Sequence, residues 1–281
     1  MDLPYWTHED CFIFKPDFNG SIIEYLDIIK LYSKLIFSNF NNLELSITEN
    51  NNNNNYLDNQ YNFRYKLSAS NYIGSKFNKP LANELTTLTN LTHLTFGEIF
   101  NKPLTNSLMQ ITNLTHLTFG FSQPLANSLD QLINLTHIFF GYWFNKPLGN
   151  SLNKLINLTC LTFGYKFNQH LANSLDQLIN LTHLTFGYDF SQHLNNSLDR
   201  LTSLQYLTFG NEFNKPLANS FDQLINLTNL TFGYSFNQSL TSSLDQLINL
   251  KNLTFGRNFN QPLENLLDKL LNLTHVFRLE F

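Results

Sequence analysis

The sequence contains few charged residues and almost no cysteine, and these shortages exclude several classes of protein. Only 14% of its 281 residues are Asp, Glu, Lys or Arg, whereas 42% are hydrophobic. A disordered chain has low hydrophobicity and high net charge, so disorder over the whole length is excluded. The formal net charge of -4 is the opposite of the basic surface that binds nucleic acid. Two cysteines are too few for a disulfide framework.

Long apolar runs and common catalytic motifs are missing as well. No run approaches the roughly 20 apolar residues that a helix needs to cross a bilayer. Residues 1–16 carry acids in place of the basic start and apolar stretch of a signal peptide. We therefore expect a soluble, intracellular protein that binds neither membranes nor nucleic acid. The chain has no glycine-rich phosphate loop, Cys-x-x-Cys pair or Ser-His-Asp arrangement, so we expect neither an enzyme nor a cofactor.

The sequence is instead dominated by one repeat, whose period follows from the numbers of two successive copies (181 − 158 = 23). Its consensus is L-x-x-L-T-F-G-x-x-F-N-x-P-L-x-x-S-L-x-x-L-x-N, and we number its positions 1 to 23. A worn copy covers residues 68–90, and a copy that is two residues short begins at Leu114. We divide the chain into a non-repeating segment, residues 1–67, and nine units with a terminal strand, residues 68–281. Full copies begin at Leu91, Leu135, Leu158, Leu181, Leu204, Leu227 and Leu250.

The residue pattern of one unit predicts its local structure. Positions 1 to 6 alternate as in a short β-strand, and we expect Gly187, at position 7, to end its strand with a positive φ. Ser174 and Gln177 match a capping box, which predicts a single 3₁₀ or α turn on the opposite side. In an isolated unit, the free energy gained by burying about seven large apolar side chains cannot offset the conformational entropy lost when the unit becomes ordered, which costs roughly 1.5 kcal/mol per residue. The units must therefore stack into an α/β solenoid with parallel strands.

Two asparagine columns and one histidine column run through the repeat. We expect the Asn residues at positions 11 and 23 to bond the backbones of adjacent coils. Position 3 points outward from the strand and places His and Cys about 4.8 Å apart, which raises the hypothesis of a zinc or copper stripe. Side chains in a straight ladder diverge, whereas tetrahedral metal binding needs ligands that converge on one point. We therefore expect no bound metal. The column contains His93, His116, His137, Cys160, His183, Tyr206, Asn229, Asn252 and His275.

A second outward column follows each strand at positions 8 and 9, where aromatic and charged residues gather. Such a mixture is typical of interface hot spots, although the same rings could simply cover the edge of the coil. We keep this column, together with His137, His183 and Tyr206 on the strand face, as the candidate partner-binding residues. The column contains Tyr142, Trp143, Tyr165, Lys166, Tyr188, Asp189 and Tyr234.

The repeat resembles the FNIP repeat, a relative of the leucine-rich repeat known chiefly from social amoebae and from giant viruses of amoebae. The string F-N-x-P-L with its L-T-x-L-T-F-G lead carries the resemblance over residues 68–281. The resemblance implies a leucine-rich-repeat-like horseshoe, a protein-interaction role without shared catalytic residues, and a cytoplasmic location, in the host if the source is viral. Some members carry an F-box before the repeats. A substrate-recruiting ubiquitin-ligase adaptor, with residues 1–67 as a degenerate F-box that binds a Skp-type protein, is therefore the alternative function.

Residues 1–67 differ from the array in charge. They hold nine acids and five bases, whereas residues 68–281 hold twelve of each, so the whole net charge of -4 lies in this segment. Apolar residues at helical spacing predict an amphipathic helix over residues 21–37, which either caps the first coil or docks a partner. We also expect a strand over residues 42–47 and a surface loop over the asparagine run 50–55. The leading prediction is a non-enzymatic module that binds an unknown protein partner.

Overall fold

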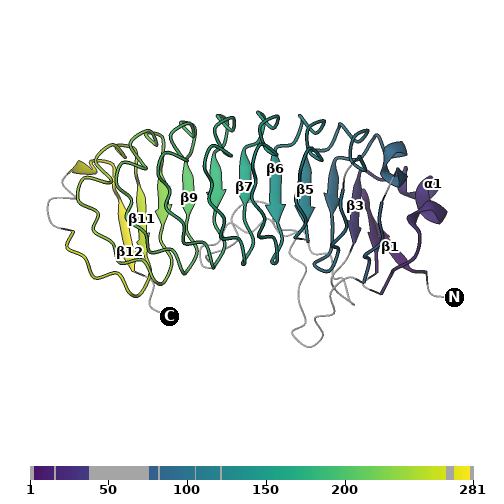
Figure 1. Cartoon of the computed structure of the whole chain (residues 1–281), viewed down its shortest axis with the longest axis horizontal. Helices are drawn as coiled ribbons and strands as arrows, with labels where there is room; N and C mark the ends of the chain where they lie inside the picture. Colours follow the sequence, from purple (N-terminus) through teal and green to yellow (C-terminus); the bar gives the residue numbers. More distant parts are fainter. Residues whose placement is uncertain are drawn as a thin grey trace.

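The computed structural model describes residues 3–15, 17–37, 76–81, 83–104, 106–120, 122–263 and 269–278. Within these ranges, twelve strands form one sheet in chain order, and the chain is a solenoid (Figure 1). The predicted fold class is confirmed. Strands β1 (Tyr5–His8) and β2 (Cys11–Phe14) pair antiparallel, and every later pair is parallel. The others are β3 (Lys34–Phe37), β4 (His93–Thr95), β5 (His116–Phe119), β6 (His137–Phe140), β7 (Cys160–Thr162), β8 (His183–Thr185), β9 (Tyr206–Thr208), β10 (Asn229–Thr231), β11 (Asn252–Phe255) and β12 (His275–Arg278).

The helix predicted over residues 21–37 is shorter than expected. A 3₁₀ helix, Ile22–Tyr25, continues into α1 (Leu26–Ile29), and the chain then enters β3. The reason is the sheet, because β3 pairs with both β2 and β4 and buries Leu35 and Phe37 at positions 4 and 6 of the repeat. Another 3₁₀ helix covers Glu84–Thr87, and the later described coils turn through i to i+3 backbone hydrogen bonds.

A coil of the solenoid already lies within residues 1–67. Cys11 of β2 is opposite Lys34 of β3, and their numbers differ by one period of the repeat (34 − 11 = 23). Phe18 stacks on Phe77 with ring centroids 5.9 Å apart, and the Asn78 amide donates to Asn19 Oδ1 at 3.3 Å. Phe18 and Asn19 therefore occupy positions 10 and 11 of a coil that lacks most other consensus residues. The segment that was predicted to be non-repeating contributes strands to the array.

β3 and β4 are neighbours in the sheet although they lie far apart in the sequence. Lys34 pairs with His93 (93 − 34 = 59), and this separation exceeds one period by 36 (59 − 23). The predicted strand at residues 42–47, the asparagine run 50–55 and the boundary between residues 67 and 68 all lie outside the described residues. Because β4 pairs directly with β3, the coil that ends at residue 90 takes its strand from Lys34–Phe37.

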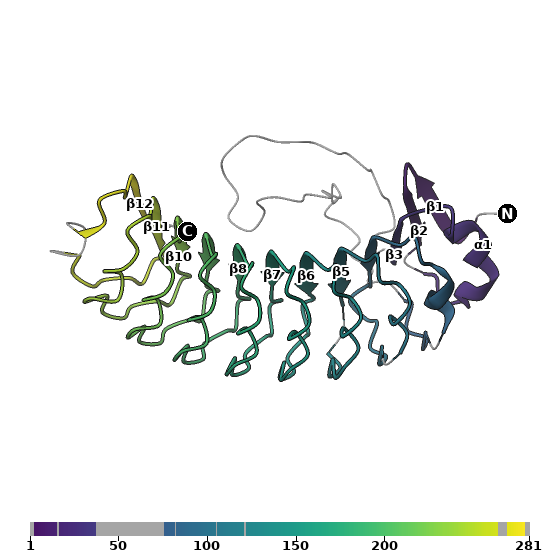
Figure 2. The same cartoon turned by 90° about the horizontal axis from the view of Figure 1, so that it is seen from above.

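The array curves with its strands on the inner, concave side (Figure 2). Ring centroids at position 3 are 4.1 Å apart for His93 and His116. In the buried Phe columns the spacing between adjacent coils rises to 5.6 Å for Phe163 and Phe186, and to 6.1 Å for Phe167 and Phe190. Adjacent coils therefore diverge away from the strands, as a horseshoe requires. The two Phe columns and the Leu residues form one continuous core along the array.

The glycine at position 7 is needed for a close approach, and the predicted positive φ is wrong. A Cβ added at Gly187 would lie only 1.8 Å from the carbonyl oxygen of Gly164 in the preceding coil. Among the described glycines, positive φ occurs at Gly149, at position 15, where Ala126 and Ala172 also adopt it. The left-handed residue thus lies on the far side of the coil and tolerates a Cβ.

Both predicted asparagine ladders are present. The side-chain amide at position 23 donates to a backbone carbonyl of the preceding coil, as Asn180 Nδ2 does to Ile156 O at 2.9 Å. At position 11 the side-chain oxygen accepts from the next coil, as Asn145 Oδ1 does from the Asn168 amide at 3.0 Å. Each of these hydrogen bonds is one rung of a ladder that connects the turns of neighbouring coils. The asparagines of the ladders do not lie on the strand face, which is formed by other residues.

Candidate protein-binding surface

The histidines at position 3 form stacked rings on the concave face. His116 stacks between His93 and His137 with centroids 4.1 and 4.2 Å apart. Each ring Nδ1 lies 2.8 to 2.9 Å from the hydroxyl of the preceding Thr. The Thr115 and Thr136 hydroxyls donate to backbone carbonyls, so their oxygens can only accept from the rings. This hydrogen bonding assigns the ring proton to Nδ1 and gives the histidines a structural role.

The electrostatics of this column keep four of its histidines neutral. Partial burial, followed by the charge of Lys34, lowers the pKa of His93 to about 4. Burial and the two flanking histidines lower the pKa of His116 to about 3. Burial also lowers the pKa of His137 and His183 and raises the pKa of the Cys160 thiol. At neutral pH these groups therefore add no charge to the concave face.

The metal-stripe hypothesis finds no support in the geometry of the column. The rings of His93, His116 and His137 lie within 9° of parallel, so their nitrogens do not converge on a common point. Among the described residues, no group of three or more His, Cys, Asp or Glu side chains could hold a metal ion. Cys160 lies between His137 and His183 in the sheet and separates these two candidate residues.

The column at positions 8 and 9 is brought together in three adjacent coils. Tyr165 stacks between Tyr142 and Tyr188, with centroids 4.7 and 4.5 Å apart. Trp143 packs edge-on against Tyr142 and is 54% exposed. We call this group the aromatic rim patch, and it is completed by an ion pair of 3.0 Å between Lys166 Nζ and Asp189 Oδ2. The patch contains Tyr142, Trp143, Tyr165, Lys166, Tyr188 and Asp189.

The other predicted residues lie apart from this patch. Tyr234 is separated from Tyr188 by the coil that carries Asn211 at the same position. Tyr206 stacks on His183 at 4.3 Å on the concave face. The structure therefore supports a compact patch over three coils rather than a rim that extends to Tyr234.

One exposed aromatic residue was missed by sequence reasoning. Phe139 points outward from β6 at position 5 and is 48% exposed. Coils on both sides have Thr118 and Thr162 in register with it. The signal was the string HIFF in place of HLTF, because a large apolar residue at an outward position has no packing role in the core.

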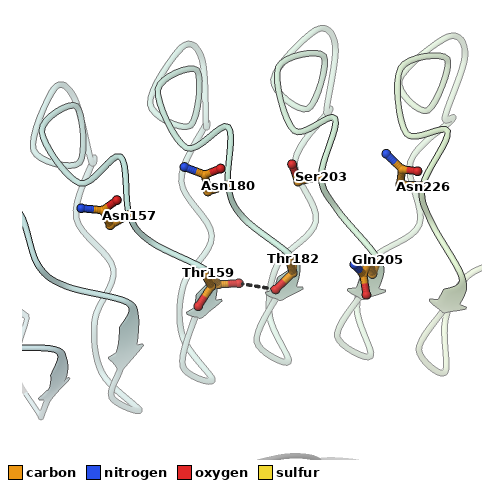
Figure 3. A pocket seen from close by; sticks show the side chains of 7 residues that line it. All are labelled: Asn157, Thr159, Asn180, Thr182, Ser203, Gln205 and Asn226. Atoms are coloured by element: carbon orange, nitrogen blue, oxygen red, sulfur yellow. Dashed lines mark hydrogen bonds between the residues drawn. The ribbon is translucent and has the colours of Figure 1, made fainter.

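A groove with a volume of about 570 Å³ lies next to the strand starts and is lined only by uncharged polar side chains. Figure 3 shows that the side chains at position 23 form a row in which Ser203 is the short member. The sequence signal is the string TSLQY at residues 202–206, which replaces the usual INLTH. The lining residues are Asn157, Thr159, Asn180, Thr182, Ser203, Gln205 and Asn226.

Comparison with known proteins places this fold among the leucine-rich-repeat solenoids. The chain is similar to CroV588, a circular leucine-rich-repeat protein of the giant virus CroV, with a TM-score of 0.64 and 25% identity over 99% of this chain and 42% of CroV588. The chain thus spans less than half the length of CroV588. No protein-family model and no curated protein matches the sequence.

Two bacterial proteins share the fold at lower identity. The internalins InlF and InlC2 of Listeria monocytogenes give TM-scores of 0.52 and 0.54, both at 18% identity. The alignments cover 75% and 69% of this chain, and 73% and 84% of the internalins. Over the described ranges, no helix has the length and apolar character needed to cross a membrane.

Proposed function

We propose that this chain is a non-enzymatic module that binds a protein partner through the aromatic rim patch and the neighbouring concave face. The observation that carries the proposal is the exposure of Phe139, Trp143 and Tyr188 within a span of three successive coils. A contiguous aromatic surface is costly to expose and is the composition that interface hot spots favour. The leucine-rich-repeat fold supports the same role, because a solenoid offers an extended concave surface to partners.

The structure allows a test that avoids damage to the fold. Each exposed residue can be replaced by the residue that another coil has at the same position. The triple variant Phe139→Thr, Trp143→Ser and Tyr188→Asn uses the side chains found at Thr162, Ser235 and Asn211. A matched control, Tyr234→Asn, removes an exposed tyrosine outside the patch. The wild type and both variants serve as baits in affinity purification with crosslinking from the native cell.

We expect a partner that the wild type and the Tyr234→Asn control retain and that the triple variant loses. The triple variant loses the Tyr165–Tyr188 stack, which contributes about 0.5 to 1.5 kcal/mol, so its stability in thermal unfolding should fall by no more than this amount. A partner retained equally by the triple variant would refute the role of the patch. A triple variant that loses the partner together with more stability than the stack contributes would indicate that the rings cover the coil edge rather than bind.

Membership of the FNIP-repeat family is better supported than the function of a ubiquitin-ligase adaptor. Family membership is supported by the F-N-x-P-L string in several coils, such as those of Asn145 and Asn214. The ubiquitin-ligase adaptor is disfavoured, because residues 11–33 form a coil of the solenoid and leave no separate helical domain there. Recovery of a Skp-type adaptor by the full chain would restore that function.

A further inference from the structure

The asparagine ladder at position 23 is broken in one coil. The carbonyls of Ile156 and Thr202 accept from the side-chain amides of Asn180 and Asn226, both at 2.9 Å. At the corresponding place between them, no described side chain donates to the carbonyl of Ile179, because Ser203 is too short to reach where Asn reaches. The break therefore leaves an unpaired backbone acceptor beside the groove.

The next column is broken in the same coil. Thr182 donates its hydroxyl to the Thr159 carbonyl at 3.0 Å, whereas the following coil has Gln205 at this position. No described residue hydrogen-bonds to the Gln205 side chain, which is exposed in the groove and has both an amide donor and a carbonyl acceptor. Tyr206 stands next to it on the concave face, stacked on His183.

These two breaks define the chemistry of a ligand. The acceptor at Ile179 and the donor and acceptor of Gln205 complement a group that both donates and accepts. The groove contains no charged side chain, so it offers nothing to compensate the desolvation of an ion. We infer that the groove at Ser203 binds the side-chain carboxamide of an Asn or Gln residue of the partner, which completes the missing rung. The inference rests on the proposed protein-binding function and specifies the partner's chemistry.

The test uses small probes and the full-length chain. N-acetyl-asparagine N-methylamide carries the carboxamide, and N-acetyl-leucine N-methylamide has a side chain of similar shape without polar atoms. The corresponding aspartate probe adds a charge. Chemical shifts of the ¹⁵N-labelled protein are followed as each probe is titrated. We expect saturable shifts at Ser203, Gln205 and Asn226 with the asparagine probe alone.

Two variants test the site itself. Ser203→Asn restores the rung and should weaken the asparagine probe about tenfold or more, with unchanged or higher thermal stability. Asn249→Ser removes a rung elsewhere, where Asn249 donates to Ile225 O at 2.8 Å, and should leave probe binding unchanged. Equal shifts with the leucine probe, or wild-type binding by Ser203→Asn, would overturn the inference. Neither result affects the rim-patch test, so failure of the groove and failure of the proposed function are distinguishable.

Discussion

Replacing the position 7 glycine with alanine should damage this fold more than most single substitutions. In Gly187→Ala the new Cβ would lie 1.8 Å from the oxygen and 2.4 Å from the carbon of the Gly164 carbonyl. Contacts under 3.0 Å are essentially never seen for a Cβ, so the two coils must move apart until both distances exceed that limit. Both opposing atoms are backbone, and no rotamer change can relieve the clash. Overpacking of this kind, with displacement of the stacked Phe residues, should cost about 3 to 5 kcal/mol.

Urea unfolding followed by circular dichroism measures this loss, and hydrogen exchange of the flanking coils shows where it occurs. The control is Gly149→Ala, because nothing lies within 4 Å of its added Cβ and Ala172 has the same left-handed φ at position 15. We expect the control to cost about 1 kcal/mol or less. A Gly187→Ala protein no less stable than the control would refute the close-approach argument.

Two further predictions concern the concave face and the ladders. His93 and His116 have pKa values of about 4 and 3 in the fold against 6.5 when unperturbed, so the unfolded chain binds more protons between these values. The free energy of unfolding should therefore fall as the pH drops from about 6.5 to 3. Thermal unfolding at pH 7 and pH 4 measures this fall, which should be smaller in His116→Asn than in the wild type. An equal fall in both proteins would contradict the prediction. Asn113→Ala should cost about 1 kcal/mol through the lost bond to Thr89 O (2.7 Å), measured by urea unfolding, whereas no loss would make the rung dispensable.

The periodic part of the fold could be predicted because the repeat fixes both strand register and burial. Each strand from β4 to β12 begins at position 3, within the expected span of positions 1 to 6, and the Phe and Leu positions are buried almost without exception. The asparagine ladders followed from the same logic, since a compact coil has to bond its turns. The error at Gly187 was local, because sequence alone does not distinguish a positive φ from a close approach by a neighbouring coil.

The first coil could not be predicted for a physical reason. Residues 11–33 keep the period but few of the consensus letters: the matches are Phe14, Phe18, Asn19 and Leu26 at positions 6, 10, 11 and 18. Helical spacing after residue 21 was a real signal, but strand pairing in the sheet ended the helix at Ile29 and made β3 from Lys34–Phe37. The pairing of β3 in the sheet thus outweighed the helical periodicity of the sequence, which does produce a helix up to Ile29.

The candidate site was harder to predict than the fold. The consensus residues are explained by core packing and by hydrogen bonds between coils, so they carry no information about a binding surface. Under the proposed function, we expect partner choice to depend on exposed residues that depart from the consensus, such as Phe139, Trp143 and Gln205. We expect a chain with Phe139→Thr, Trp143→Ser, Tyr188→Asn, Ser203→Asn and Gln205→Thr to keep the fold and to lose no more stability than the Tyr165–Tyr188 stack contributes. It should nevertheless retain no partner in the crosslinking assay. A consensus-restored chain that still binds the partner would show that recognition comes from the repeat itself.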